Sequence, residues 1–210
     1  MKKVLFSVVL ALATTFGASA QLWIGGEVGF SSSTAKTDDF KATASTFSIA
    51  PEIGYSINDN LGVGLTFAFG TEGQKIGDAD RESASAFAIA PFVQYKAIEF
   101  GKFQLFARAA FQFESNTGAY ELGEELDDLW GDDKLKMSGF GVNIAPYMHY
   151  VINEKFNLVA KLNFLSLGFA SVTPKYDGEK GITISTFNFG VDANNVANTG
   201  AFQLGFIYKF

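Results

Sequence analysis

The chain has 210 residues, no cysteine, and 22 acidic against 16 basic side chains, which give a formal net charge of −6. An acidic chain is a poor partner for nucleic acid, and the lack of thiols excludes disulfides, thiolate metal sites and thiol catalysis. Phenylalanine (23) and glycine (22) are abundant while proline (4) is scarce, which favours a β-sheet with one aromatic and one crowded face over a helical bundle.

The first twenty residues have the three parts of a secretory signal peptide. A basic start at Met1–Lys3 precedes an apolar run at Val4–Phe16, and residues 18–20 (Ala-Ser-Ala) form a small-residue cleavage site. The apolar run is short for a membrane-spanning helix. We therefore predict a cleaved signal peptide over residues 1–20 and one domain over 21–210, which keeps 14 basic and 22 acidic side chains and a formal charge of −8.

From residue 23 onwards, large apolar residues alternate with small or polar ones. This period of two is the pattern of a β-strand whose two faces meet different surroundings. In the last segment, for example, Phe202, Leu204 and Phe206 share one face, and Tyr208 and Phe210 continue it. The predicted strands cover residues 23–31, 46–57, 61–70, 87–95, 103–113, 140–150, 156–164 and 201–210.

The links between these strands alternate in length. Residues 58–60 (Asn-Asp-Asn) and 153–155 (Asn-Glu-Lys) have the composition of tight turns. Residues 32–45, 71–84 and 115–136 are long polar segments. Short turns at one end and long loops at the other are typical of a transmembrane barrel.

Three strands carry the near-repeat Ile-Ala-Pro-x-x-x-Tyr, at residues 49–55, 89–95 and 144–150. A short link follows each copy, so Tyr55, Tyr95 and Tyr150 are predicted at one end of the barrel, in an interfacial aromatic girdle. Proline cannot donate a ladder hydrogen bond. We therefore predict a local β-bulge at each of the three prolines.

The main question is which face of the strands lies outside. If the aromatic face contacts lipid, five charged residues gather in an interior only wide enough for side chains, where they can neutralise one another. On the lipid face each charge would cost about 2–4 kcal/mol at mid-bilayer. The first arrangement is preferred, and the alternative is a soluble, lipocalin-like carrier with an aromatic cavity. The predicted interior charges are Glu27, Glu52, Arg108, Lys161 and Lys209.

The signal peptide, the eight amphipathic strands, the Pro-x-x-x-Tyr repeat with its Asn-Asp-Asn turn and the terminus Gly-Phe-Ile-Tyr-Lys-Phe (205–210) together resemble a known family. It is that of the small outer-membrane β-barrel proteins of the OmpA-barrel and OmpX type, in the form common in Bacteroidota. The resemblance implies an all-β, eight-stranded antiparallel up-and-down transmembrane barrel in the cell outer membrane, as a monomer. It also implies that Phe206, Tyr208 and Phe210 form a signal for the outer-membrane assembly machinery.

Residues 171–200 contain one further strand-like run, Ile184–Val191. If this run crossed the membrane by itself, the final strand would leave Phe210 outside, against the family pattern. We therefore predict a hairpin that projects beyond the bilayer within the last loop. A ten-stranded barrel is the alternative.

Little in the sequence points to catalysis. His149 is the only histidine and lies on the inward face, and residue 151 is a valine rather than the serine that a His-x-Ser hydrolase pair would need. We predict a packed polar residue. Glu27 and Glu52 could face each other as an acid and base, but an ion pair with Arg108 or Lys161 is preferred. No catalytic residue, cofactor or metal site is predicted.

The segment 121–133 carries seven carboxylates around Trp130. Clustered carboxylates can bind calcium, but their spacing is not that of a calcium loop. A solvated acidic loop is preferred, with Trp130 as an interface anchor or a partner contact.

These observations predict a non-catalytic integral outer-membrane protein with a structural or surface-interaction role through its extracellular loops. The expected partners are the bilayer, the assembly machinery, and an extracellular ligand or host surface. A narrow pore for small solutes is the first alternative, and it depends on whether the interior charges block the lumen.

Overall fold

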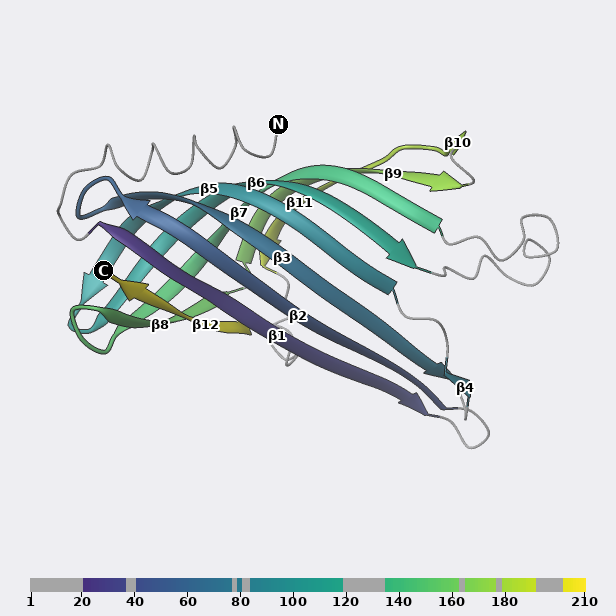
Figure 1. Cartoon of the computed structure of the whole chain (residues 1–210), viewed down its shortest axis with the longest axis horizontal. Coiled ribbons are helices and arrows are strands. Elements are labelled where there is room, and N and C mark those ends of the chain that lie inside the picture. Colours follow the sequence, from purple (N-terminus) through teal and green to yellow (C-terminus); the bar gives the residue numbers. More distant parts are fainter. Residues whose placement is uncertain are drawn as a thin grey trace.

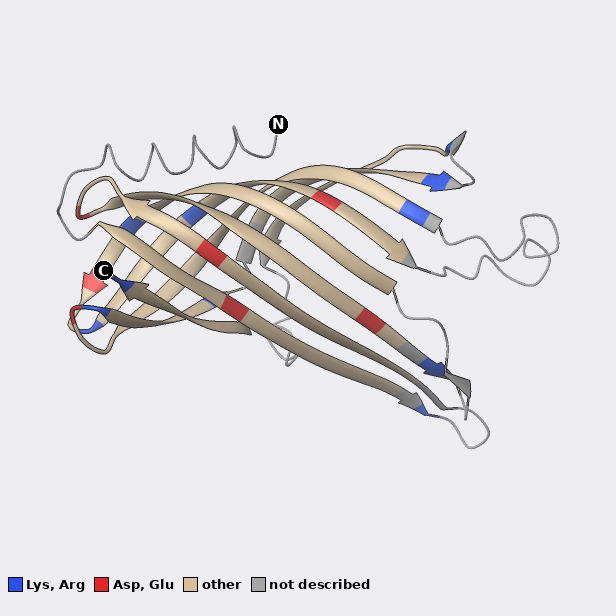
Figure 2. Ribbon diagram, viewed as in Figure 1, with Lys and Arg blue, Asp and Glu red and all other residues tan. Residues whose placement is uncertain are grey.

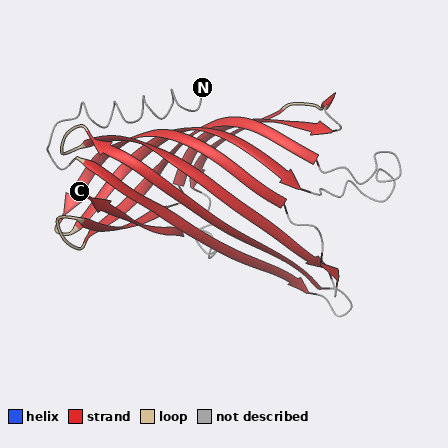
Figure 3. Cartoon of the chain, in the orientation of Figure 1, coloured by secondary structure: helices blue, strands red, loops and turns tan. Residues whose placement is uncertain are grey.

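The computed structural model describes residues 21–36, 41–76, 79–80, 84–118, 135–162, 165–176, 179–191 and 202–210. The described chain is built from β-strands (Figure 3). The predicted signal peptide and the acidic segment 121–133 with Trp130 lie outside the described residues, so these assignments stay predictions. Within the described part of the chain, no helix is long and apolar enough to span a membrane.

The twelve described strands form a single sheet, in which β1 to β7 follow one another in chain order apart from the short β4 (Figure 1). Their bounds are β1 (Leu22–Lys36), β2 (Lys41–Ser56), β3 (Leu61–Ile76), β4 (Ala79–Asp80), β5 (Ala84–Phe100), β6 (Phe103–Gly118), β7 (Leu135–Val151), β8 (Phe156–Leu162), β9 (Leu165–Tyr176), β10 (Glu179–Lys180), β11 (Ile184–Val191) and β12 (Phe202–Lys209).

Eight of these strands close into an antiparallel barrel. The ladder runs β1, β2, β3, β5, β6, β7, β8 and β12, and β12 pairs back onto β1. In the closing pair, Trp23 lies opposite Lys209 and Val28 opposite Leu204. The predicted eight-stranded antiparallel barrel is therefore confirmed.

The two ends of the barrel differ in their connections. Tight turns at 57–60, 101–102 and 152–155 lie at the end that also holds the C-terminus, here called the turn end. Two of these turns are closed by asparagine: Asn58 Oδ1 accepts from the backbone N–H of Leu61 at 2.8 Å, and Asn153 Oδ1 accepts from that of Phe156 at 2.9 Å. Towards the opposite end, the loop end, the strands spread apart (Figure 1).

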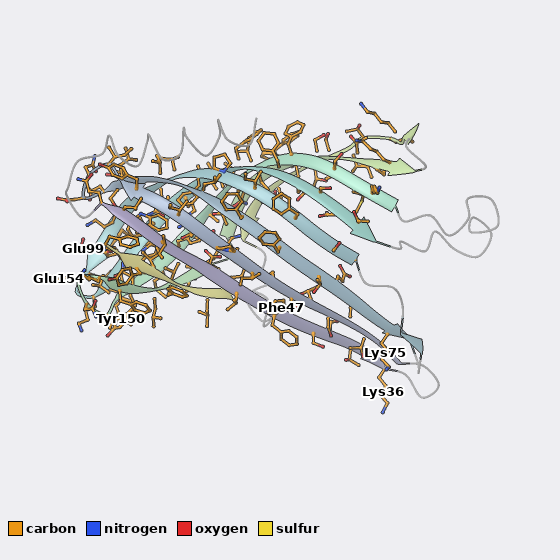
Figure 4. The ribbon with its side chains drawn as sticks, viewed as in Figure 1. Lys36, Phe47, Lys75, Glu99, Tyr150 and Glu154 are labelled. Atoms are coloured by element: carbon orange, nitrogen blue, oxygen red, sulfur yellow. The ribbon has the colours of Figure 1, made fainter. Side chains whose placement is uncertain are left out.

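The outer surface of the barrel is apolar. On β2, Phe47, Ile49 and Ile53 are 51%, 44% and 41% exposed, whereas Glu52 between them is buried. Phe47 points away from the sheet in Figure 4. The same alternation holds on the other long strands, so the large apolar face is outside and the small and charged face is inside, as the sequence predicted.

The last two barrel positions differ from the prediction. β8 and β9 both pair with β7, but the register changes between them. Tyr147 pairs with Lys161 and Ile144 pairs with Leu167, so three residues along β7 correspond to six residues along the β8–β9 segment. β11 pairs antiparallel with β9, so the two strands form a hairpin. Phe187 lies opposite Phe169, which itself lies opposite Val142 of β7. The predicted hairpin is therefore confirmed, but its projection beyond the apolar wall is wrong, because the hairpin lies beside β7 at the level of Val142.

The ten-stranded alternative is wrong for the same reason. β11 pairs with β9, and β12 pairs with β8. β11 and β12 therefore lie one above the other on the same side of the β8–β9 segment, and they do not add two separate strands to the barrel. Alternation marks β11 as a strand, but it carries no information about which neighbour the strand pairs with.

The bulges predicted at Pro51 and Pro91 are absent. At Pro51 the pairing of β2 with β3 is interrupted, yet the frame is the same on both sides of the gap, and Pro91 interrupts the β5–β6 pairing in the same way. Proline removes a donor on one side of the strand, and the ladder tolerates the missing bonds without an inserted residue. Pro146 coincides with the change of frame between β8 and β9, and the β5–β6 register shift lies elsewhere, at Lys96–Ile98.

Candidate functional site in the barrel lumen

The centre of the lumen is occupied by Arg108 of β6, which is 3% exposed. Its guanidinium carbon lies 4.0 Å from the ring centroids of both Phe92 and Tyr147, so the planar group is held between two aromatic rings. Such contacts stabilise a cation more strongly when water is excluded. The arginine is therefore fixed in position by packing as well as by charge.

The guanidinium is paired with a carboxylate from the opposite part of the wall. Arg108 Nη1 donates to Glu52 Oε2 at 2.6 Å, and Nη2 donates to Glu52 Oε1 at 3.3 Å and to Gln94 Oε1 at 2.9 Å. Glu27 Oε1 lies 4.0 Å from Nη1. A two-pronged arginine–carboxylate contact of this kind is the geometry that best compensates for burying both charges.

The proline repeat explains how the strands bring this group together. The residue after proline in the three copies is Glu52, Phe92 or Tyr147, and all three contact Arg108. Each lies one position beyond an outward proline, so each points inward. Arg108 itself is opposite Gln94 on β5 and Ala145 on β7 in the ladder. We call Glu27, Glu52, Phe92, Gln94, Arg108 and Tyr147 the Arg108 cluster.

The structure brings only part of the predicted interior set together. Glu27, Glu52 and Arg108 are buried within the Arg108 cluster. Lys161 on β8 lies opposite Tyr147 in the ladder, and its charge interacts with those of Glu27, Arg108 and Glu52. Lys209 lies at the turn end, apart from the cluster. The acid/base arrangement of Glu27 and Glu52 has no support, since Glu52 is engaged by Arg108.

The sequence reasoning missed Phe92, Gln94 and Tyr147. Two of them are large aromatic residues on strand faces that otherwise carry small or polar residues. Their shared place after proline in the repeat is the signal that could have found them.

The predicted girdle tyrosines all lie at the turn end. Tyr55 is opposite Leu22, Tyr95 is opposite Leu61, and the Tyr150 ring packs at 5.0 Å from that of Phe103. Tyr150 lies at the same end as Glu99 and Glu154, and Lys36 and Lys75 lie at the loop end (Figure 4). Their role at the lipid interface stays a prediction.

The predicted terminal signal lies on β12 at the same end. Phe206 and Phe210 are exposed on the outer face, and the Tyr208 and Phe210 rings meet edge to face at 5.4 Å. On the inner face of this strand Ile207 is buried. The role of these aromatic residues in assembly stays a prediction.

His149 lies inside the barrel near the turn end and is 2% exposed. Its ring stacks on that of Phe106 with centroids 4.3 Å apart, and its Nε2 has no hydrogen-bond partner within the described residues. The part of the chain that the structure describes holds no group of three or more potential metal ligands.

Few positions along the strands carry a charge (Figure 2), and the mid-strand charges of the Arg108 cluster face the interior. An apolar outer wall with charged groups neutralised inside is what a lipid bilayer requires of a closed barrel. It is the reverse of a soluble carrier. These features define an integral outer-membrane β-barrel protein.

The family model described as "Outer membrane protein beta-barrel domain" matches residues 4–210, and the chain belongs to this family. The protein is thus located in the outer membrane, with the bilayer as its surroundings. No curated protein matches the sequence.

Solved structures of outer-membrane proteins have a similar fold at low sequence identity. OprG from Pseudomonas aeruginosa is 16% identical with a TM-score of 0.50, over 92% of this chain and 98% of that one. Neisserial surface protein A is 13% identical with a TM-score of 0.48, over 92% and 99% of the two chains. A major outer membrane protein from Thermus thermophilus is 15% identical with a TM-score of 0.46, over 92% and 100%.

Proposed function

We propose that this barrel does not conduct solutes and has a structural or surface-interaction role, carried by the chain at its loop end. The observation that supports a non-conducting lumen is the Arg108 cluster. Its side chains come from β1, β2, β5, β6 and β7, and they meet in the middle of an eight-stranded interior that is only wide enough for side chains. A solute would have to displace a buried, paired arginine.

The polar extension of the wall supports a role at the loop end. Beyond the apolar outer surface, β1 and β2 continue as a hairpin whose facing hydroxyls bond to each other across the strands. Ser31 meets Thr46 at 2.7 Å, Ser32 meets Ser45 at 3.2 Å, and Thr34 meets Thr43 at 3.1 Å. Side chains of this kind suit water rather than lipid, so this part of the wall stands outside the bilayer and can present the adjoining segments to partners.

Conductance in planar lipid bilayers tests the closed lumen. We expect the refolded protein to give no unitary current steps, because the Arg108 cluster blocks the path. The Arg108→Ala variant serves to assign any current to the lumen. Reproducible steps from the unaltered protein whose size changes in Arg108→Ala would instead support the narrow-pore alternative.

Protease treatment of intact cells tests the exposure of the loop end. We expect an external protease to cut within residues 119–134, which connect β6 and β7 at that end, and to leave the turns at 58–60 and 153–155 intact. Cleavage at those turns in unbroken cells would contradict the proposed orientation.

We also propose that Phe206, Tyr208 and Phe210 are read by the outer-membrane assembly machinery, and that the barrel has no catalytic role. The aromatic terminus and its place on the closing strand β12 support the first proposal. The second rests on His149, whose ring packs against Phe106 and whose Nε2 has no hydrogen-bond partner within the described residues.

A further inference from the structure

The Arg108 cluster divides the lumen, and a cavity of about 370 Å³ lies on its turn-end side. Gln94 belongs to both, since its Oε1 accepts from Arg108 and its side chain lines the cavity. The cavity walls include Trp23, Phe106 and Ile207 together with His149, Asn157 and Lys209. This volume falls within the range of small-molecule sites.

Two buried polar atoms in these walls have no partner. His149 is 2% exposed and Asn157 is 1% exposed, and within the described residues neither His149 Nε2 nor Asn157 Oδ1 makes a hydrogen bond. Leaving a buried polar atom unpaired costs about 1–3 kcal/mol. Two such atoms in the wall of one cavity are available to the polar groups of a molecule that enters it.

A cation stands beside these atoms. Lys209 lines the cavity. Among the described residues no carboxylate lies within 4.0 Å of its ammonium group, and the carboxylate that acts on it from further away is that of Glu99. The second lining lysine, Lys96, is bonded to Glu99, which is exposed. The lining carboxylate Asp59 is exposed in the turn at 57–60, where solvent screens its charge.

The chemistry of the walls therefore combines an apolar surface, a hydrogen-bond acceptor at Asn157, an imidazole at His149 and an unpaired ammonium group at Lys209. We propose that this cavity is a binding site for a small organic carboxylate that also carries a hydroxyl or amide N–H. Lys209 binds the carboxylate, the N–H or O–H donates to Asn157 Oδ1, and the apolar part of the ligand packs on Trp23 and Phe106.

Trp23 provides the readout. The chain has two tryptophans, so in a Trp130→Phe background the emission comes from Trp23 alone, in the cavity wall. The probe is mandelate, which has a phenyl ring, a hydroxyl and a carboxylate. Phenylethanolamine keeps the ring and the hydroxyl but has a positively charged amine in place of the carboxylate. It therefore measures any binding that does not depend on the carboxylate.

With the full chain folded in detergent micelles, we expect mandelate to change the Trp23 emission to saturation and phenylethanolamine to have no saturable effect. Lys209→Gln should weaken mandelate binding by at least about tenfold, since a charge-assisted contact is lost. Lys209→Arg should retain binding. Lys102→Gln, which removes an exposed charge at the same end of the barrel, is the matched control and should change nothing.

Three results would overturn the assignment. They are a mandelate response that does not saturate, a response to phenylethanolamine as strong as that to mandelate, and a mandelate affinity that is the same in Lys209→Gln. If Lys209→Gln does not fold, the comparison uses Asn157→Leu, which should weaken mandelate binding and leave any non-specific response unchanged. Neither result depends on whether the lumen conducts.

Discussion

Arg108 is the residue on which the interior of the barrel depends. Its charge is neutralised by Glu52 and its faces are covered by Phe92 and Tyr147, so every side of the guanidinium except Nε is occupied within the described residues. Removing one partner of a buried pair exposes the other to the full cost of desolvation, which is larger than the value of the pair itself.

The first prediction concerns this pair. Arg108→Met should lower the free energy of unfolding by about 3–5 kcal/mol, because Glu52 is left as an unpaired buried charge. The double variant Arg108→Met/Glu52→Met should recover most of that loss. Urea unfolding of the protein refolded in detergent measures both, and Lys136→Met, at an exposed position on β7, is the control. Equal losses in the single and double variants would contradict the role assigned to Glu52.

A second residue-scale prediction concerns the glycine that faces Trp23. A methyl group added at Gly54 would overlap the Trp23 indole, whereas one at Gly73 on the neighbouring strand would meet nothing within 4 Å. Gly54→Ala should therefore destabilise the barrel by about 1–3 kcal/mol through overpacking. Gly73→Ala should be close to neutral. The urea midpoints of the two variants provide the comparison, and equal midpoints would mean that Trp23 moves aside without cost.

At the scale of the strand, the apolar face of β2 meets lipid over only part of its length. Ile49 and Ile57 share that face and are 44% and 48% exposed, but Ile57 lies in the turn beyond Tyr55. Because the two side chains are similarly exposed, a comparison of these positions tests the effect of depth in the bilayer.

Ile49→Arg should cost about 2–4 kcal/mol, and Ile57→Arg about 0–1 kcal/mol, because the charge penalty falls from the midplane towards the interface. Unfolding from phospholipid vesicles measures both. Similar costs at the two positions would show that the apolar band does not end at the predicted tyrosine girdle.

The strand β12 allows folding and assembly to be separated. Phe210→Ser removes an outward aromatic at the end of the chain while leaving the buried Ile207 in place. We expect the variant to refold in detergent as the unaltered protein does, but to reach the outer membrane in smaller amounts in cells. Phe100→Ser, which removes another exposed phenylalanine from the turn end, is the control. Equal amounts of the two variants in outer-membrane fractions would contradict a terminal assembly signal.

Much of this arrangement could be predicted from the sequence, because a period of two assigns each residue to the inside or the outside. The inward position of Arg108 and Glu52 follows from that rule alone. The pairing of the strands does not follow from that rule. The contact between Arg108 and Gln94 depends on the register of β5 with β6. The place of β11 depends on the change of register between β8 and β9, where six residues correspond to three of β7. The alternation of apolar and polar residues contains no information about either register. The sequence therefore predicts which charges lie inside the barrel, but not which of them contact one another.

On the scale of the whole molecule, the closed ladder predicts resistance to detergent. Every strand at the turn end has two hydrogen-bonded neighbours, so unfolding has no free edge from which to start. In detergent electrophoresis of outer-membrane fractions, we expect the unboiled protein to migrate faster than the boiled one. A single mobility and recovery with soluble periplasmic proteins would contradict the barrel in the membrane.

The closing hydrogen bonds of the turn end bring the two ends of the described chain together. The backbone N–H of Phe210 donates to Leu22 O at 3.1 Å, and Trp23 lies opposite Lys209. Residue 210 can therefore be joined to residue 21 by a short linker and the ring reopened within the turn at 58–60, which preserves every strand pair. Such a circular permutant should refold in detergent although its chain now ends in β2. Its amount in the outer membrane of cells would show whether assembly depends on which strand is last in the chain or only on the folded barrel.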